Sequence, residues 1–334
     1  RQPDAGDGQL SDCCGLLRPV FSTEQESGLQ PEHRYDDYVA YEGEILKDDI
    51  RREAGVDTAA MFTDADEARE AAVAEAEPQP AEFEVVYEDE DILVINKPAG
   101  MVVHPGHGNY EHTLLNALAY YFRDQLDIND PNIGLVHRID KDTSGLLLIA
   151  KTPEAKTNLG QQFFNHTTER TYNALVWGTF AEDSGTVEGA LARDTRDRTI
   201  YRIWDLEENP NAKEAITHWR VLERFPYVTL VECRLETGRT HQIRVHMKSI
   251  GHPLFADEKY GGMEVLKGLR TQKYRQYIQN CFALCPRQVL HAKTLGFTHP
   301  RTGERMHFDS PWAPDFTNLI NKWRSYYKSH IFLM

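Results

Sequence analysis

The sequence predicts an α+β fold, in which a mixed, mostly antiparallel sheet carries flanking helices. Apolar runs of strand length recur between hairpin turns, and stretches with helical spacing are scattered among them instead of alternating regularly with strands. The sequence pattern changes near residue 83, where a long acidic stretch with little hydrophobic periodicity is followed by these apolar runs. We therefore expect one folded domain at 83–328, preceded by an extension at 1–82.

The extension carries most of the acidic charge. Residues 1–90 hold 25 acidic and 7 basic side chains, whereas the rest of the chain holds 27 acidic and 30 basic ones. Such a segment cannot bury enough apolar surface to fold alone, so we expect 1–82 to be largely disordered, with at most one helix at about 64–77. Because the domain is slightly basic, the overall net charge of −15 does not exclude a polyanionic partner.

The first half of the domain begins with a hairpin. Residues 83–97 contain two strand-like runs around an acidic turn. Residues 112–126 carry apolar side chains at helical spacing. The apolar run at 145–151 predicts a strand, and the segment 153–168, which begins with proline, predicts a helix.

The second half is predicted to consist mainly of strands. Pro226 breaks one long β-rich stretch into two strands, and Gly251 ends a short helix. In order, we expect a strand at 170–180, a polar excursion from the core at 183–213, strands at 215–225 and 227–236, a helix at 240–250, a hairpin at 290–311 and a closing helix at 313–328.

Several function classes are excluded by what the sequence lacks. No apolar run reaches the roughly 18 residues of a membrane span, so we expect no membrane partner. There is no P-loop, dinucleotide fingerprint or nucleophile elbow, which predicts chemistry without a cofactor. The five cysteines are irregularly spaced and fit a reducing cytoplasm. His241 and His246 lack a neighbouring carboxylate ligand, so we expect no metal site.

Two aspartates directly precede an apolar, strand-like run in "GLVHRIDKDTSGLLLIAK", residues 134–151. A polar loop that ends where an apolar strand begins places its last residues at the rim of the core, where a carboxylate can be partly desolvated and still reach a ligand. Asp142 precedes Thr-Ser-Gly, which is ordinary turn chemistry. One acid is therefore a turn residue, and Asp140 is the better candidate for chemistry, although the local pattern alone leaves both open.

A second polar segment is basic. In "RLETGRTHQIRVHMKSIGHP", residues 234–253, Arg239 and Arg244 flank the start of the predicted helix. Arg244 and Lys248 are four residues apart and share one helix face. A basic helix start suits the binding of phosphate or carboxylate.

These segments form a recognisable combination. "INKPAGMVVHPG", "HRIDKDTSGLLLIAKT", "RTYNALVWG", "LETGRTHQIRVHM" followed by "GHPL" and "YGG", and "LHAKTLGFTHPRTGE" together resemble the RluA-type family of RNA pseudouridine synthases. The similarity covers 83–318, about 70% of the chain, and looks closest to the branch that modifies large-subunit ribosomal RNA. It implies a pseudouridine synthase catalytic domain, an RNA partner and an isomerase reaction without cofactor.

The resemblance also implies roles for individual residues. Asp140 matches the catalytic aspartate, Tyr172 the active-site tyrosine, and Arg244 the arginine that pairs with the acid. Ile139 stands where the family usually has leucine, a conservative departure. The residues expected to contact RNA are Lys97, His137, Arg138, Arg239 and His241. Of these, Arg138 would enter the space that the flipped base leaves. Further contacts with phosphate are expected from Arg193, Arg196, Arg198 and Arg202.

The residue types suit this chemistry. A buried nucleophilic carboxylate needs a cation beside it to remain ionised, and Arg244 would supply that charge to Asp140. Tyr172 offers an aromatic face to a base that has left its stack. Residues 1–82 show no resemblance to the S4-type module that many relatives carry, which leaves target choice open.

The sequence also allows other substrates and functions. Transfer RNA is a possible substrate besides ribosomal RNA, and a ribosome-assembly factor that binds RNA without needing catalysis would carry the same fold. A hydrolase with Asp140 and Asp142 as paired carboxylates is disfavoured, because adjacent turn positions do not share one substrate geometry. We expect the protein to be a monomer.

Overall fold

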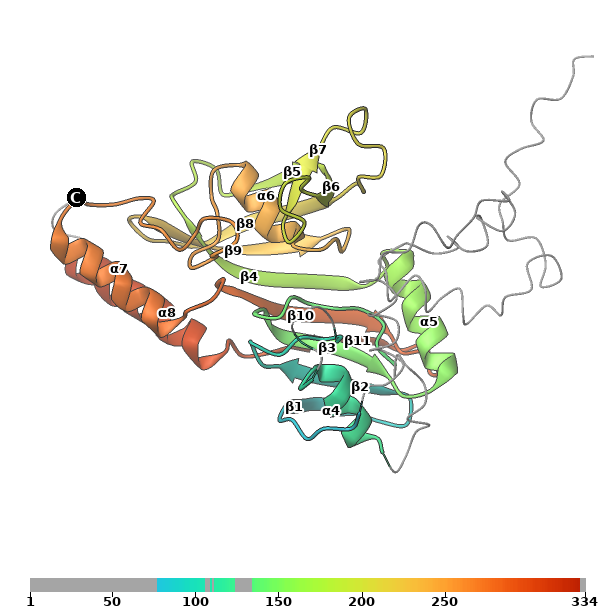
Figure 1. Ribbon diagram of the computed structural model, residues 1–334. Helices are drawn as coiled ribbons and strands as arrows, with labels where there is room; N and C mark the ends of the chain where they lie inside the picture. Colours follow the sequence, from blue (N-terminus) through green and yellow to red (C-terminus); the bar gives the residue numbers. More distant parts are fainter. Residues whose placement is uncertain (1–76, 106–108, 110, 124–133, 331–334) are drawn as a thin grey trace, which may run out of the picture.

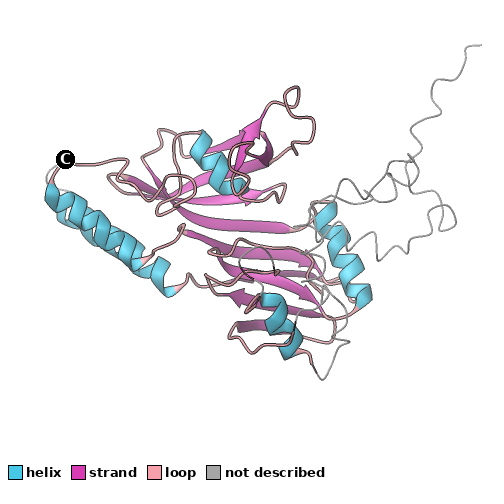
Figure 2. Ribbon diagram, in the orientation of Figure 1, coloured by secondary structure: helices cyan, strands magenta, loops and turns pink. Residues whose placement is uncertain are grey.

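The computed structural model describes residues 77–105, 109, 111–123 and 134–330 (Figures 1 and 2). The extension predicted at 1–82, with its helix at about 64–77, therefore lies almost wholly outside the described residues. In the part that is described, no helix is both long enough and apolar enough to cross a membrane.

The described chain forms one large sheet, a small hairpin and five helices. The strands are β1 (Glu84–Glu88), β2 (Ile92–Lys97), β3 (Ser144–Ala150), β4 (Glu169–Trp177), β5 (Ser184–Glu188), β6 (Ala190–Arg193), β7 (Tyr201–Trp204), β8 (Ile216–Arg224), β9 (Val228–Leu235), β10 (Leu290–Thr298) and β11 (Arg305–Asp309). The helices are α4 (Leu114–Tyr121), α5 (Pro153–Phe164), α6 (Gln242–Ser249), α7 (Gln272–Leu284) and α8 (Pro314–His330).

The large sheet is antiparallel apart from one pair. Its order is β1-β2-β3-β10-β4-β9-β8-β5, with β11 paired to β10, and β10 runs parallel to β3. Figure 1 shows β4 between two halves of the sheet, with β1, β2, β3 and β10 on one side and β9, β8 and β5 on the other. The predicted mixed, mostly antiparallel sheet is confirmed.

Strand β3 supports the loop that carries Asp140. All seven of its residues are buried, and alternate side chains point to opposite faces. Leu147 and Ile149 pack into the cluster that contains α4, whereas Leu146 and Leu148 pack into the cluster that contains α5. A strand covered on both faces gives the loop before it a rigid base.

One expectation for the second half was wrong, and one helix was not predicted. The segment 183–213 is no excursion from the core, because β5 extends the large sheet by pairing with β8, and β6 and β7 form a hairpin packed on α6. Helix α7 was missed, although its buried residues Tyr274, Ile278, Cys281 and Phe282 have helical spacing. It packs against α8 at one end of the sheet (Figure 1).

Candidate active site

Asp140 lies in a turn that leads into β3. The turn is closed by the main chain, since the amide of Thr143 donates to the carbonyl oxygen of Asp140 at 3.0 Å. The closing bond therefore does not come from the Asp142 carboxylate, to which the sequence assigned the turn. The side chain of Asp140 is 18% exposed and lines a pocket, which leaves its carboxylate accessible to a ligand.

A buried lysine holds this turn from one side. The ammonium of Lys97 donates to the carbonyl oxygens of Pro98 and Met101, both at 2.8 Å, and of Lys141 at 3.1 Å. Three acceptors match the three donors of an ammonium, although burial lowers the pKa of Lys97 to about 7. Lys97 is fully buried, so the predicted contact between Lys97 and RNA is wrong, and its role is to position the turn.

A buried arginine holds the turn from the other side. Arg287 donates from Nη1 to the carbonyl oxygen of Asp142 at 2.8 Å and from Nη2 to the hydroxyl of Ser144 at 3.2 Å. Its Nε and Nη2 also bind the carboxylate of Asp315, in the first turn of α8, at 2.7 and 2.9 Å. The sequence analysis missed Arg287, which ties the loop of Asp140 to the C-terminal helix.

Arg244 joins two carboxylates at the centre of the site. Its Nη1 donates to Oδ2 of Asp140 at 2.9 Å, while Nε and Nη2 donate to the two oxygens of Asp257 at 2.7 and 2.9 Å. The bidentate bond to Asp257 fixes the plane of the guanidinium and leaves one nitrogen for Asp140. The pairing of Asp140 with Arg244, 104 residues apart, is present in the structure.

Asp257 was not assigned a role from the sequence, although it lies within the "GHPLFADEKYGG" segment that matches the family. A tight loop delivers it to Arg244. Ala256 has a left-handed φ of 61°, and a side chain at Gly262 would lie only 1.7 Å from the carbonyl oxygen of Leu254. Asp257 is fully buried, and its two hydrogen bonds from Arg244 offset the cost of removing its carboxyl group from water.

The surroundings of Asp140 keep it ionised. Burial raises the pKa of the Asp140 carboxyl, but His241, in the acid range where its ring is protonated, and Arg244 and Arg138 lower it below its ordinary value. A carboxylate that is both charged and partly exposed can act as a nucleophile at neutral pH.

The remaining wall of the pocket contains an aromatic ring and several cations. Tyr172 lies on β4, is buried, and has a raised pKa because of that burial. Arg170, two residues earlier, lines the same pocket. Of the residues predicted to contact RNA, Arg138, Arg239 and His241 also line it.

His137 is not among the residues that line the pocket. Its Nε2 accepts a hydrogen bond from the amide of Leu148 at 2.9 Å, its Nδ1 is buried, and its ring stacks on Phe163 at 4.4 Å. Burial lowers its pKa to about 3, so the ring is neutral. The ring of His137 thus joins β3 to α5, and the RNA contact of this partly exposed residue remains a prediction.

The arginines of the β6–β7 hairpin lie outside the pocket. Arg202 stacks on Trp204 at 3.6 Å and lies 3.7 Å from Asp194, and Arg193 donates to the carbonyl oxygen of Arg198. Their contact with phosphate remains a prediction.

Comparison with known proteins identifies the family. Residues 91–249 match the family described as RNA pseudouridylate synthase. An uncharacterized RNA pseudouridine synthase of Bacillus subtilis is 45% identical over 247 residues, which cover 74% of each chain. The chain belongs to the RNA pseudouridine synthase family. The ribosomal large subunit pseudouridine synthase D of Zymomonas mobilis is also 45% identical to this synthase, over 73% of this chain and 74% of that protein.

Solved structures agree with this assignment. Human RNA pseudouridylate synthase domain containing 1 is 26% identical to this synthase with a TM-score of 0.54, over 72% of this chain and 90% of that one. Human RNA pseudouridylate synthase domain containing 4, at 22% identity and a TM-score of 0.57, shares the fold. The predicted RluA-type family, fold and isomerase reaction are confirmed.

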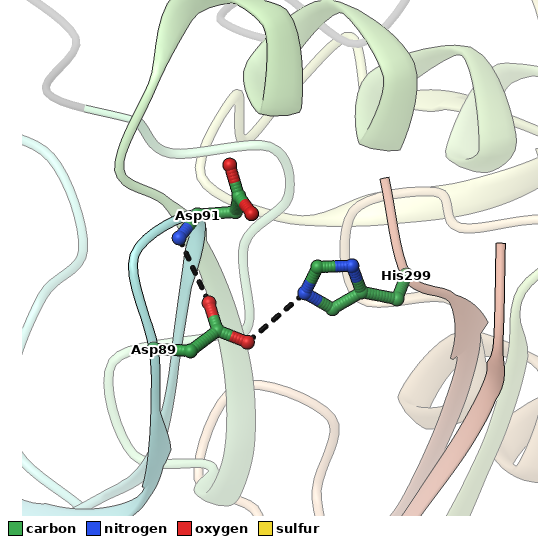
Figure 3. A group of neighbouring side chains, drawn as sticks. All are labelled: Asp89, Asp91 and His299. Atoms are coloured by element: carbon green, nitrogen blue, oxygen red, sulfur yellow. Dashed lines mark hydrogen bonds and ion pairs between the residues drawn. The ribbon is translucent and has the colours of Figure 1, made fainter. Parts of the chain in front are cut away.

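One cluster of this synthase has the composition of a metal site. Asp89, Asp91 and His299 bring three ligand atoms within 4.8 Å of one another (Figure 3). However, Asp89 accepts hydrogen bonds from the amide of Asp91 and from His299, and Asp91 pairs with Arg301 at 2.7 Å. Protein donors already bind both carboxylates, and the cluster joins the β1–β2 turn to the β10–β11 turn.

Proposed function

We propose that this synthase isomerises uridines of large-subunit ribosomal RNA, with Asp140 as the nucleophile. The observation that carries the proposal is the ionised, accessible carboxylate of Asp140, held by Arg244 at 2.9 Å. The choice of RNA rests on relatives such as the ribosomal large subunit pseudouridine synthases D of Zymomonas mobilis and Pseudomonas aeruginosa, the latter 44% identical over 76% of this chain.

The reaction breaks the C1′–N1 bond of uridine, turns the detached uracil and forms a C1′–C5 bond. The hydrogen on C5 leaves as a proton and N1 gains one, so no oxidant or energy source is needed. Asp140 attacks either C1′ of the sugar or C6 of the base, and both routes return the carboxylate when the new bond has formed. Arg244 supports each route by keeping Asp140 charged and fixed in orientation.

The other pocket residues act on the base and its surroundings. The uridine must leave its stack to reach Asp140, at a cost of a few kcal/mol, and Arg138, which lines the pocket, would occupy the vacated space. Tyr172 lines the pocket, where its ring would provide a stacking surface that returns about 1–3 kcal/mol and its hydroxyl would serve the proton transfer at C5.

The proposal also covers the bounds of the catalytic domain, the oligomeric state and the cellular compartment. We place the catalytic domain at 83–328, in agreement with a sheet that starts at β1 and a helix α8 that closes the fold. We further propose that the enzyme is a cytoplasmic monomer. The described cysteines, Cys233, Cys281 and Cys285, are all buried and free, as in a reducing compartment.

The test uses unmodified transcripts of large-subunit ribosomal RNA and transfer RNA in parallel. After incubation with the full chain, pseudouridine is located by carbodiimide labelling and primer extension. New pseudouridines confined to ribosomal RNA would support the proposal. Modification of transfer RNA alone would overturn the choice of target. Tight binding without modification of either RNA would favour an assembly factor and overturn the catalytic role.

A further inference from the structure

The buried hydroxyl of Tyr260 connects the β6–β7 hairpin to the active site. Its oxygen lies 2.9 Å from the amide nitrogen of Tyr201 at the start of β7 and 2.7 Å from Nδ1 of His241. An amide can only donate, so the Tyr260 oxygen accepts from Tyr201. Within the described part of the chain its own proton has one hydrogen-bond partner, Nδ1 of His241.

The second nitrogen of the His241 ring faces the catalytic acid. Its Nε2 lies 4.0 Å from Oδ2 of Asp140, the oxygen that also binds Arg244. If Nδ1 accepts the proton of Tyr260, Nε2 carries the hydrogen and presents it to a carboxylate. The opposite tautomer would leave the Tyr260 hydroxyl without an acceptor and point a lone pair at Asp140. Both ends of the ring therefore favour the same tautomer.

We propose that His241 is a positioning residue, a neutral Nε2–H donor aimed at Asp140 and held in that tautomer by Tyr260. The inference rests on the proposed role of Asp140, and it replaces the RNA contact expected for His241 from the sequence. Through Tyr201, the donor is also tied to the hairpin that carries Arg193 and Arg202, so that hairpin and catalytic carboxylate share one hydrogen-bonded chain.

The local structure maintains this arrangement. His241 adopts a left-handed φ of 56° at the start of α6, a conformation that is unfavourable for a residue with a side chain and that the surroundings must enforce. Tyr260 lies beneath Arg244, 4.9 Å from guanidinium to ring centre, and its amide donates to Asp257 at 3.2 Å. Tyr260 thus contacts His241, Arg244 and Asp257, three members of the site.

The ring of His241 is uncharged at neutral pH. Burial lowers its pKa to about 4, with Asp140 and Asp257 acting to raise it and Arg244 and Lys259 acting to lower it further. The 4.0 Å gap exceeds hydrogen-bond distance, and such contacts commonly tighten when substrate fills the site. We expect the bond to form fully once a flipped uridine occupies the pocket.

The tautomer can be measured without reference to activity. The full chain labelled with ¹⁵N-histidine is studied by long-range ¹H–¹⁵N correlation at pH 7, and His241 is assigned from the spectrum of His241→Asn. We expect a protonated Nε2 and an unprotonated Nδ1, and loss of that preference in Tyr260→Phe. A protonated Nδ1, or a doubly protonated ring at pH 7, would overturn the proposal.

Kinetics separate positioning from RNA binding. Asparagine tolerates the left-handed backbone and keeps a polar group near Nδ1, but it lacks Nε2. We expect His241→Asn to slow single-turnover pseudouridine formation about 10- to 100-fold with little change in RNA Kd. His218→Asn, at a histidine on β8 that is 30% exposed, is the matched control and should change neither value. A higher Kd with an unchanged rate in His241→Asn would instead assign His241 to RNA binding. An inactive wild type would refute the proposed function, and the spectrum would still decide the tautomer.

Discussion

Replacing Arg244 by lysine tests the electrostatic centre of the site. Arg244 is 4% exposed and makes three charge-assisted hydrogen bonds, two to Asp257 and one to Asp140. A lysine keeps the charge but offers a single nitrogen, so about two of these bonds are lost, each worth about 1.5–3 kcal/mol. Because the charge remains, we expect the free energy of unfolding to fall by about 3 kcal/mol, the lower end of that range.

Arg244→Lys should also slow pseudouridine formation, in addition to lowering the free energy of unfolding. Without the planar fork Asp140 is no longer held in one orientation, and a displacement of about 1 Å costs on the order of 100-fold in rate. The pKa of Asp140 is lowered in the folded state. The charge of Asp140 therefore stabilises the folded protein at neutral pH, and this stabilisation is lost as the pH falls through the folded-state pKa. With weaker pairing, burial raises the pKa, and the acid limb of the rate profile moves to higher pH.

The assay is single-turnover pseudouridine formation between pH 3 and 8, a range that includes the acid limb of the wild type, together with urea unfolding. Arg239→Lys is the matched control, since Arg239 is partly exposed and its Nε donates to one carbonyl oxygen, that of Glu214 at 3.2 Å. We expect it to leave stability and the acid limb nearly unchanged. An Arg244→Lys enzyme with the wild-type rate and an unmoved acid limb would refute the role of Arg244.

Other predictions follow from Lys97 and Tyr172. Lys97→Met should lower the free energy of unfolding by about 3 kcal/mol in urea titrations, because three carbonyl oxygens lose their donor, yet leave the salt dependence of RNA binding unchanged. A shallower salt slope would show that Lys97 contacts phosphate after all. Tyr172→Phe should keep RNA Kd and slow product formation, whereas Tyr172→Leu should also lose about 1–3 kcal/mol of stacking. Equal behaviour of the two variants in filter binding and single turnover would contradict a stacking role.

The elements that the sequence predicted well are those whose signal is local. The hairpins β1–β2 and β10–β11 pair apolar alternation with a turn, and α5 begins with proline after the capping residue Thr152. Helix α7 was missed because polar residues outnumber its buried ones, and only its position against α8 makes the apolar stripe meaningful. The edge strand β5 was missed because its pairing with β8 is what makes it a strand.

In the site, too, some residues could be predicted from the sequence and others only from the folded structure. Asp140, Tyr172 and Arg244 match family residues with known roles. Asp257 lies in a family-like segment but was given no role, and both it and Arg287 act through partners that only the folded chain brings near. Lys97 was misassigned because lysine is rarely buried, so a solvent-facing role was the natural expectation. Three backbone carbonyl oxygens that converge on one point are not visible in a sequence.

The central claim is that Asp140 is the nucleophile of an RNA pseudouridine synthase, and release of tritium from C5 tests it most directly. Ribosomal RNA labelled with tritium at C5 of uridine is incubated with the wild type and with Asp140→Asn, and RNA binding is measured alongside. We predict release by the wild type, and no release by Asp140→Asn although it still binds the RNA. Tritium release by Asp140→Asn at a rate near that of the wild type would contradict the account.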